Sequence, residues 1–102
     1  MHATGLTGLA VELLRSEERH TLILTGELDL ASAPVLHRRI SQLCRRGASA
    51  IALDLGNLTF LDSAGLRAVL LSREICERHG CEFSLIPLAR TLASYGPGAL
   101  IT

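Results

Sequence analysis

The sequence has 102 residues, which is the length of one ordinary domain, and ten arginines balance its ten acidic residues. A hydrophobic fraction of 48% with 20% charged residues is typical of a globular protein rather than a disordered one. The neutral balance and an aromatic content of 3% give neither a general attraction for polyanions nor stacking platforms, so we expect no nucleic-acid partner. Lysine is absent, which excludes Schiff-base and P-loop chemistry.

The sequence also bears on the cellular compartment. No run approaches the roughly 18 apolar residues of a membrane span, and residues 1–8 lack the pattern of a signal peptide, so we expect a flexible N-terminal segment there. Cys44, Cys76 and Cys81 are an odd number without a CxxC pair, as expected for reduced thiols in a cytoplasmic protein. Cys76 and Cys81 flank a glycine and could pair or bind metal, but buried free thiols are the favoured interpretation. The four histidines show no i, i+4 pairing, and we predict no metal site.

In chain order, the first half of the sequence predicts a hairpin and a helix. Residues 9–13 show the period of two of a half-buried strand, and a second strand follows over 21–25. The polar turn 16–20 between them favours antiparallel pairing. Ser32 is then a candidate N-cap, with Pro34 in the first turn and Gly47 as the stop.

The second half predicts a strand over 50–55, a loop opening at Gly56-Asn57, and a helix over 63–79. Leu66, Val69, Leu70 and Ile75 are assigned to that helix's apolar side. Phe60 is assigned to the core, with an interface anchor as the alternative. A strand over 82–86 and a weaker helix over about 88–95 follow. The helical crossovers imply right-handed β-α-β units, and therefore a single α/β domain with a partly parallel sheet.

The most informative segment joins the third strand to the second long helix and places Ser63 at or next to the helix start. Unpaired backbone N–H groups and the positive end of the helix dipole favour an anion there. A phosphate on Ser63 would add up to two negative charges, which this position tolerates. Ser63 could instead be a simple N-cap, while Asp62 could orient Ser63 or be the cap itself.

The run Leu61-Asp62-Ser63-Ala64-Gly65-Leu66 resembles the signature of STAS domains, in particular the bacterial anti-sigma factor antagonists. The run from Gly26 to Ala33 is similar to the family's other recurrent segment, and the element order agrees across nearly the whole chain. The resemblance implies one STAS-like domain over residues 1–102. Its mixed four- to five-stranded sheet would carry helices packed mainly on one face.

The resemblance implies that Ser63 is the residue that, in this family, is phosphorylated by an anti-sigma factor that is also a serine kinase. The unphosphorylated protein would bind the anti-sigma factor and release a sigma factor, and a serine phosphatase would reset the switch. The small Ala64 and Gly65 would let a partner approach closely, and Ala64 stands where many members have a second hydroxyl residue. The expected partner-binding residues are Glu27, Asp29, Asp62, Ser63, Ala64, Gly65 and Leu66, with a solvated loop as the alternative for Glu27 and Asp29.

Two other functions are alternatives to this one. An enzyme with Ser63 as nucleophile would need a GxSxG-type turn and a histidine base, and neither accompanies Ser63. We therefore expect no catalytic residues, no enzymatic activity and no cofactor. The second alternative keeps the STAS fold but makes the chain a scaffold subunit of a signalling or transport complex, in which Ser63 never carries phosphate.

Overall fold

The computed structural model describes residues 8–17 and 19–87, so the expected flexible N-terminal segment, except Gly8, and the weak helix over 88–95 lie outside the described residues. Strands and helices alternate much as the sequence predicts. In chain order they are β1 (Leu9–Ser16), β2 (Arg19–Leu28), α1 (Ala33–Arg45), β3 (Ala50–Leu61), α2 (Ser63–Arg78) and β4 (Glu82–Ile86).

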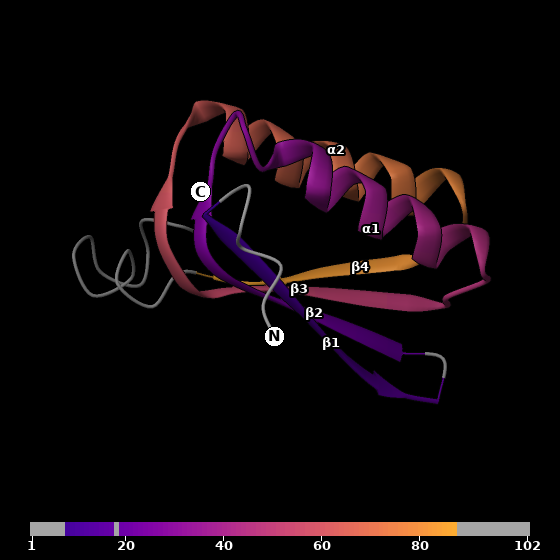
Figure 1. The fold of residues 1–102 in the computed structure, drawn as a ribbon. Coiled ribbons are helices and arrows are strands. Elements are labelled where there is room, and N and C mark those ends of the chain that lie inside the picture. The colour runs from indigo at the N-terminus through magenta and orange to yellow at the C-terminus, as the bar shows by residue number, and fades with distance from the viewer. Residues whose placement is uncertain (1–7, 18, 88–102) are drawn as a thin grey trace.

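The four described strands form one mixed sheet in the order β1-β2-β3-β4. β1 and β2 form the expected antiparallel hairpin, whereas β2–β3 and β3–β4 are parallel pairs joined through α1 and α2. Both helices lie side by side over the same face of the sheet (Figure 1). The predicted α/β class, with a mixed sheet and helices on one face, is confirmed. Neither described helix is long and apolar enough to cross a membrane.

The core lies between this face of the sheet and the two helices. Leu22 and Leu24 of β2 and Leu53 of β3 alternate with more exposed neighbours, as the period of two in a strand requires. Leu36 and Ile40, one helical turn apart, close the core from α1. All five side chains have no measurable exposure, and each such burial contributes about 1.5–3 kcal/mol.

β3 is longer than the sequence predicted, and the expected loop at Gly56-Asn57 is wrong. β3 runs on to Leu61 because β2 also continues, to Leu28, and the parallel pairing extends with them through two irregularities in register. The Asp54 carboxylate accepts a hydrogen bond from the N–H of Gly56 at 2.8 Å, which satisfies a donor beside the first irregularity. Backbone pairing therefore overrides the turn preference of the Gly-Asn pair.

Three apolar residues assigned to the core lie at the surface instead. Phe60, Leu66 and Leu70 are 49%, 50% and 53% exposed. The buried face of α2 consists mainly of small residues at helical spacing, which let the helix lie close to the sheet and to α1: Gly65, Ala68, Val69, Ser72, Ile75 and Cys76. Leu66 and Leu70 follow the buried Gly65 and Val69 by one residue each, a rotation of about 100° that turns them away from this stripe and explains their exposure.

Candidate functional site: the first turn of α2

The sheet brings the two informative sequence segments to one edge. β2 and β3 are parallel neighbours, and near their carboxyl ends Glu27 pairs with Phe60 and Leu28 with Leu61. The chain leaves β2 toward α1 and leaves β3 toward α2 at this same edge, where both strands curve up toward the helices (Figure 1). Ser63 at the start of α2 therefore lies beside the loop that begins at Asp29.

Asp62 is the N-cap of α2, which decides between the alternatives left open by the sequence. Its backbone is extended, with φ −102° and ψ −175°, and its carboxylate accepts a hydrogen bond from the N–H of Gly65 at 2.7 Å. Its carbonyl accepts the first hydrogen bond of the helix, from Leu66 at 2.9 Å. Ser63 is consequently the first helical residue and is not required as a cap.

The Ser63 side chain is exposed. Within the described part of the chain, its hydroxyl makes no hydrogen bond to another protein group. Unpaired N–H groups in the first turn and the helix dipole create a positive potential there that stabilises an added anion. Ser63 is thus accessible to a modifying enzyme, and a phosphate on it would not have to break a native contact.

Gly65 is buried, and its missing side chain serves the packing inside the domain. A Cβ atom at this position would overlap the carbonyl oxygen of Leu28 and lie 2.9 Å from Cδ1 of Leu61. The Asp62 N–H also donates to the Leu28 carbonyl, at 3.4 Å. The first turn of α2 is therefore seated directly on the end of β2, and internal packing alone accounts for glycine at position 65.

The loop before α1 is fixed by a fully buried serine. The N–H of Asp29 donates to Oγ of Ser32 at 2.9 Å, and the N–H of Ser32 donates to the Asp29 carboxylate at 3.0 Å. The Ser32 hydroxyl in turn donates to the Glu27 carbonyl at 2.9 Å. Asp29 is partly buried and closes this turn, whereas the Glu27 side chain is exposed at the same edge as Ser63.

The sequence patterns did not predict the apolar groove that lies next to Ser63. It has a volume of about 230 Å³ between the first halves of α1 and α2. Its lining consists of apolar Leu30, Ala33, Pro34, Ala64, Ala68 and Leu71 together with His37 and Arg67. Leu30, in the loop before α1, is 76% exposed. The sequence feature that could have indicated this groove is Leu30, a large apolar residue within the turn between Asp29 and Ser32.

Fold and site together define a small α/β domain that presents an exposed serine and an apolar groove at one edge of a mixed sheet. Residues 11–96 match the sequence profile of a family described as "Mlab, STAS domain". The chain belongs to the STAS domain family, as its two sequence segments implied. A comparison with curated protein sequences gives no match.

Solved structures with the same fold include anti-sigma factor antagonists. The unphosphorylated form of the antagonist SpoIIAA is 28% identical, with a TM-score of 0.64 over 86% of this chain and 84% of SpoIIAA. An antagonist from Mycobacterium paratuberculosis shares the fold at 22% identity, with a TM-score of 0.68 over 86% of this chain and 78% of its own. The protein Mglu also shares the fold, at 21% identity and a TM-score of 0.68, but the match covers 78% of this chain and only 20% of Mglu.

Proposed function

We propose that this chain is an anti-sigma factor antagonist whose binding is switched by phosphorylation of Ser63. In its unphosphorylated form it binds an anti-sigma factor with serine kinase activity, and a sigma factor is released. Phosphorylation turns this binding off, and a serine phosphatase restores it. The observation that carries the proposal is the exposed hydroxyl of Ser63 in the first turn of α2, directly beside an apolar groove.

The docking surface, on this proposal, combines the start of α2 with the groove. Glu27, Asp62, Ser63 and Ala64 supply its polar and small positions, and exposed Leu66 extends its apolar part. Gly65 and Asp29 support this surface indirectly, because Gly65 lets the first turn of α2 pack on Leu28 and Asp29 closes the loop before α1. Exposed leucines beside a concave apolar surface are typical of protein-binding sites.

The effect of phosphate on such a surface follows from its charge. Phosphoserine adds about −1.5 to −2 charges near neutral pH. These charges would lie next to Asp62 and one residue before Ala64, which lines the groove together with Arg67. The domain itself tolerates them because the helix dipole is favourable, but a docked partner would have to desolvate them. A penalty of only about 1.4 kcal/mol weakens binding tenfold.

The related structures support a switch of this kind. SpoIIAA of Bacillus has been solved in its phosphorylated form as well, and that form is 26% identical, with a TM-score of 0.65 over 87% of this chain and 86% of its own. The same fold thus accommodates the modification in that protein. This is consistent with a switch that acts at the surface and leaves the backbone in place.

The test is phosphorylation by the cognate kinase. With kinase and ATP, the purified chain should gain roughly 80 Da, the mass of one phosphoryl group, on Ser63. Ser63→Ala should remain unlabelled and bind the kinase constitutively, whereas Ser63→Asp should bind more weakly. Ser84→Ala, which removes an exposed hydroxyl from β4, is the matched control and should behave like the original chain. Labelling at another residue, or equal affinity of all Ser63 variants, would refute the switch.

A second candidate is a STAS scaffold subunit of a signalling or transport complex, without phosphate on Ser63. The description of the matching family as Mlab, rather than as an antagonist, favours keeping it. The two candidate functions differ in whether Ser63 is phosphorylated, but in both the groove can bind the partner. Leu30→Asp should weaken partner binding in both cases, whereas Ser63→Asp should weaken it only for the antagonist.

A further inference from the structure

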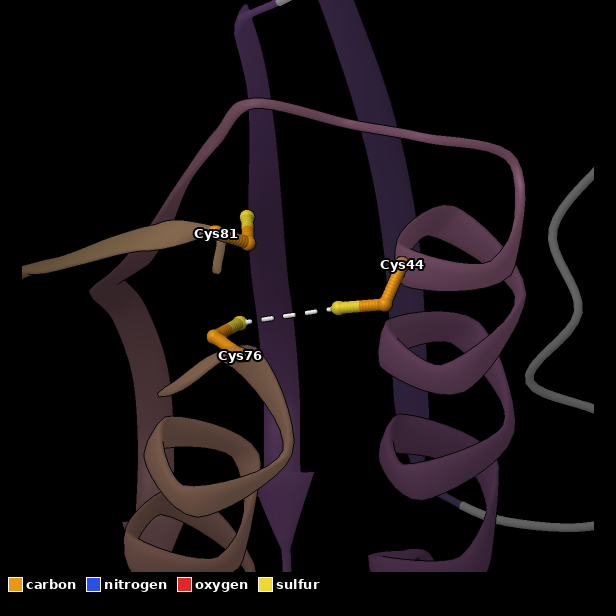
Figure 2. Close-up of side chains that lie close together, drawn as sticks. All are labelled: Cys44, Cys76 and Cys81. Atoms are coloured by element: carbon orange, nitrogen blue, oxygen red, sulfur yellow. Dashed lines mark hydrogen bonds between the residues drawn. The ribbon is translucent and has the colours of Figure 1, made fainter. Parts of the chain in front are cut away.

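All three cysteines of the chain meet at the end of the domain opposite Ser63. Cys44 comes from the last turn of α1, Cys76 from the last turn of α2, and Cys81 directly precedes β4 (Figure 2). The sulfur atoms of Cys44 and Cys76 are 3.9 Å apart, and all three sulfurs lie within 4.8 Å of one another. The three residues are 5%, 0% and 4% exposed. The sequence suggested a relation only between Cys76 and Cys81, and the packing of α1 on α2 adds the third thiol.

The surroundings of this three-cysteine cluster favour neutral sulfur. The three side chains are buried, and burial in apolar surroundings disfavours a charged thiolate. Cys44 and Cys76 lie in the last turns of their helices, where the dipole is negative and opposes a thiolate. A ligand that left net negative charge in this place would be disfavoured.

Charge balance then selects among the ions that bind sulfur. Three thiolates leave a net charge of −2 around a monovalent ion and −1 around a divalent ion, but none around a trivalent centre. A divalent ion such as zinc also takes a fourth ligand in its preferred tetrahedral geometry. Among the described residues, the group of potential metal ligands here consists of these three sulfurs alone.

We propose that Cys44, Cys76 and Cys81 form a binding site for a trivalent thiophilic metalloid of the arsenite class. Trihydroxyarsenic condenses with the three thiols, so three As–S bonds form while three As–O bonds and three S–H bonds break. Each leaving hydroxide takes one thiol proton, and three waters are released. Nothing is oxidised or reduced, and the product carries no charge.

The distances fit this three-coordinate centre better than they fit a disulfide. With bonds of about 2.3 Å, the length of a typical metal–thiolate bond, a three-coordinate centre needs sulfurs roughly 3.4–4.0 Å apart. The 3.9 Å separation already lies in that range, and the longest separation of at most 4.8 Å must close by about 1 Å. A disulfide between Cys44 and Cys76 would require sulfurs about 2.05 Å apart, so they would have to approach by nearly twice as much.

The test titrates the reduced full-length chain with sodium arsenite and follows it by native mass spectrometry and thermal unfolding. One arsenic should bind per chain, the unfolding midpoint should rise, and all three cysteines should become protected from alkylation together. Arsenite affinity should be nearly constant between pH 6 and pH 8, because neutral thiols react and no net proton is released. Zinc or cadmium binding would instead strengthen as pH rises, because those ions require thiolates.

Variants separate the site from general reactivity. Cys76→Ala, and likewise Cys44→Ala or Cys81→Ala, should lower the affinity roughly a hundredfold or more, because one tethered contact is lost. Ser72→Ala, a buried substitution one turn earlier in α2, is the matched control and should bind like the original chain. Circular dichroism checks that each variant folds, and the alkylation experiment on the unaltered chain needs no variant.

Several results would overturn this assignment. They are the absence of stoichiometric binding to the folded chain, protection of only two cysteines, and undiminished affinity in every folded single-cysteine variant. Tighter binding of zinc than of arsenite at neutral pH would assign the cluster to a divalent ion instead. Because Ser63 is 13 residues from Cys76 along α2, or about 20 Å, none of these results depends on phosphorylation.

Discussion

Substitution of Gly65 by alanine tests how the first turn of α2 is seated. The new methyl group would overlap the Leu28 carbonyl oxygen and lie 2.8 Å from its carbon and 2.9 Å from Cδ1 of Leu61. The leucine side chain can rotate away, but the carbonyl belongs to the paired end of β2 and is held by the sheet. The start of α2 must therefore lift away from the strand.

The magnitude follows from two opposing effects. Overpacking of this kind costs about 1–3 kcal/mol, and the backbone contact places Gly65→Ala in the upper part of that range. Alanine in place of glycine within a helix returns about 0.5–1 kcal/mol. The net loss should be about 1–2 kcal/mol. At roughly 4–8 °C per kcal/mol for a domain of this size, the unfolding midpoint should fall by about 5–15 °C.

The assay is urea and thermal unfolding followed by circular dichroism, with Ser63→Ala as the control. Ser63 occupies the same turn but is exposed, so its replacement should change the free energy of unfolding by less than about 0.5 kcal/mol. A Gly65→Ala variant as stable as the original chain, or more stable, would show that the helix start is not seated on Leu28. The packing argument for the position of Ser63 would then fail.

Three further predictions concern the same edge and the buried thiols. Asp62→Ala should lose about 0.5–2 kcal/mol with the N-cap, and Asp62→Asn much less, as measured by urea unfolding; equal losses would contradict the cap. Ser32→Ala should cost about 1–3 kcal/mol in the same assay, because it leaves the Asp29 N–H and the Glu27 carbonyl without their partner, and an unchanged midpoint would refute this role. The pKa of Cys76 is raised in the folded state. The contribution of its neutral thiol to stability is therefore complete below about pH 8.5 and declines as the pH rises further. Cys76→Ala should make this decline shallower when the free energy of unfolding is measured from about pH 7 to 10.

Sequence patterns predicted the elements well where hydrophobic periodicity and end signals agreed. Ser32, Pro34 and Gly47 bracketed α1, and the structure has Ser32 as the N-cap and Gly47 at φ +88° just past the helix end. The same signals failed at Gly56-Asn57, since turn preference is local whereas the end of β3 is held by pairing with β2. A single sequence does not reveal how far such pairing continues.

Only part of the candidate site could be predicted from the sequence, for a related reason. The position of Ser63 follows from the strand-to-helix boundary, which the sequence marks clearly. The groove depends on how α1 lies against α2, and a single sequence does not show this. The sequence pattern assigned Leu66 and Leu70 to the apolar side of the helix, whereas the structure buries the smaller Ala68 and Ser72. Close helix packing selected small side chains, and hydrophobicity alone did not indicate this.

The seating of Gly65 on Leu28 has a consequence for the kinetics of recognition. A helix start held by both a cap and a backbone contact has little conformational entropy left to lose when another protein docks on it. Association would then require no prior ordering step, and changes in affinity would appear mainly as changes in how quickly the complex dissociates. An antagonist built in this way would report its modification state through the lifetime of its complexes.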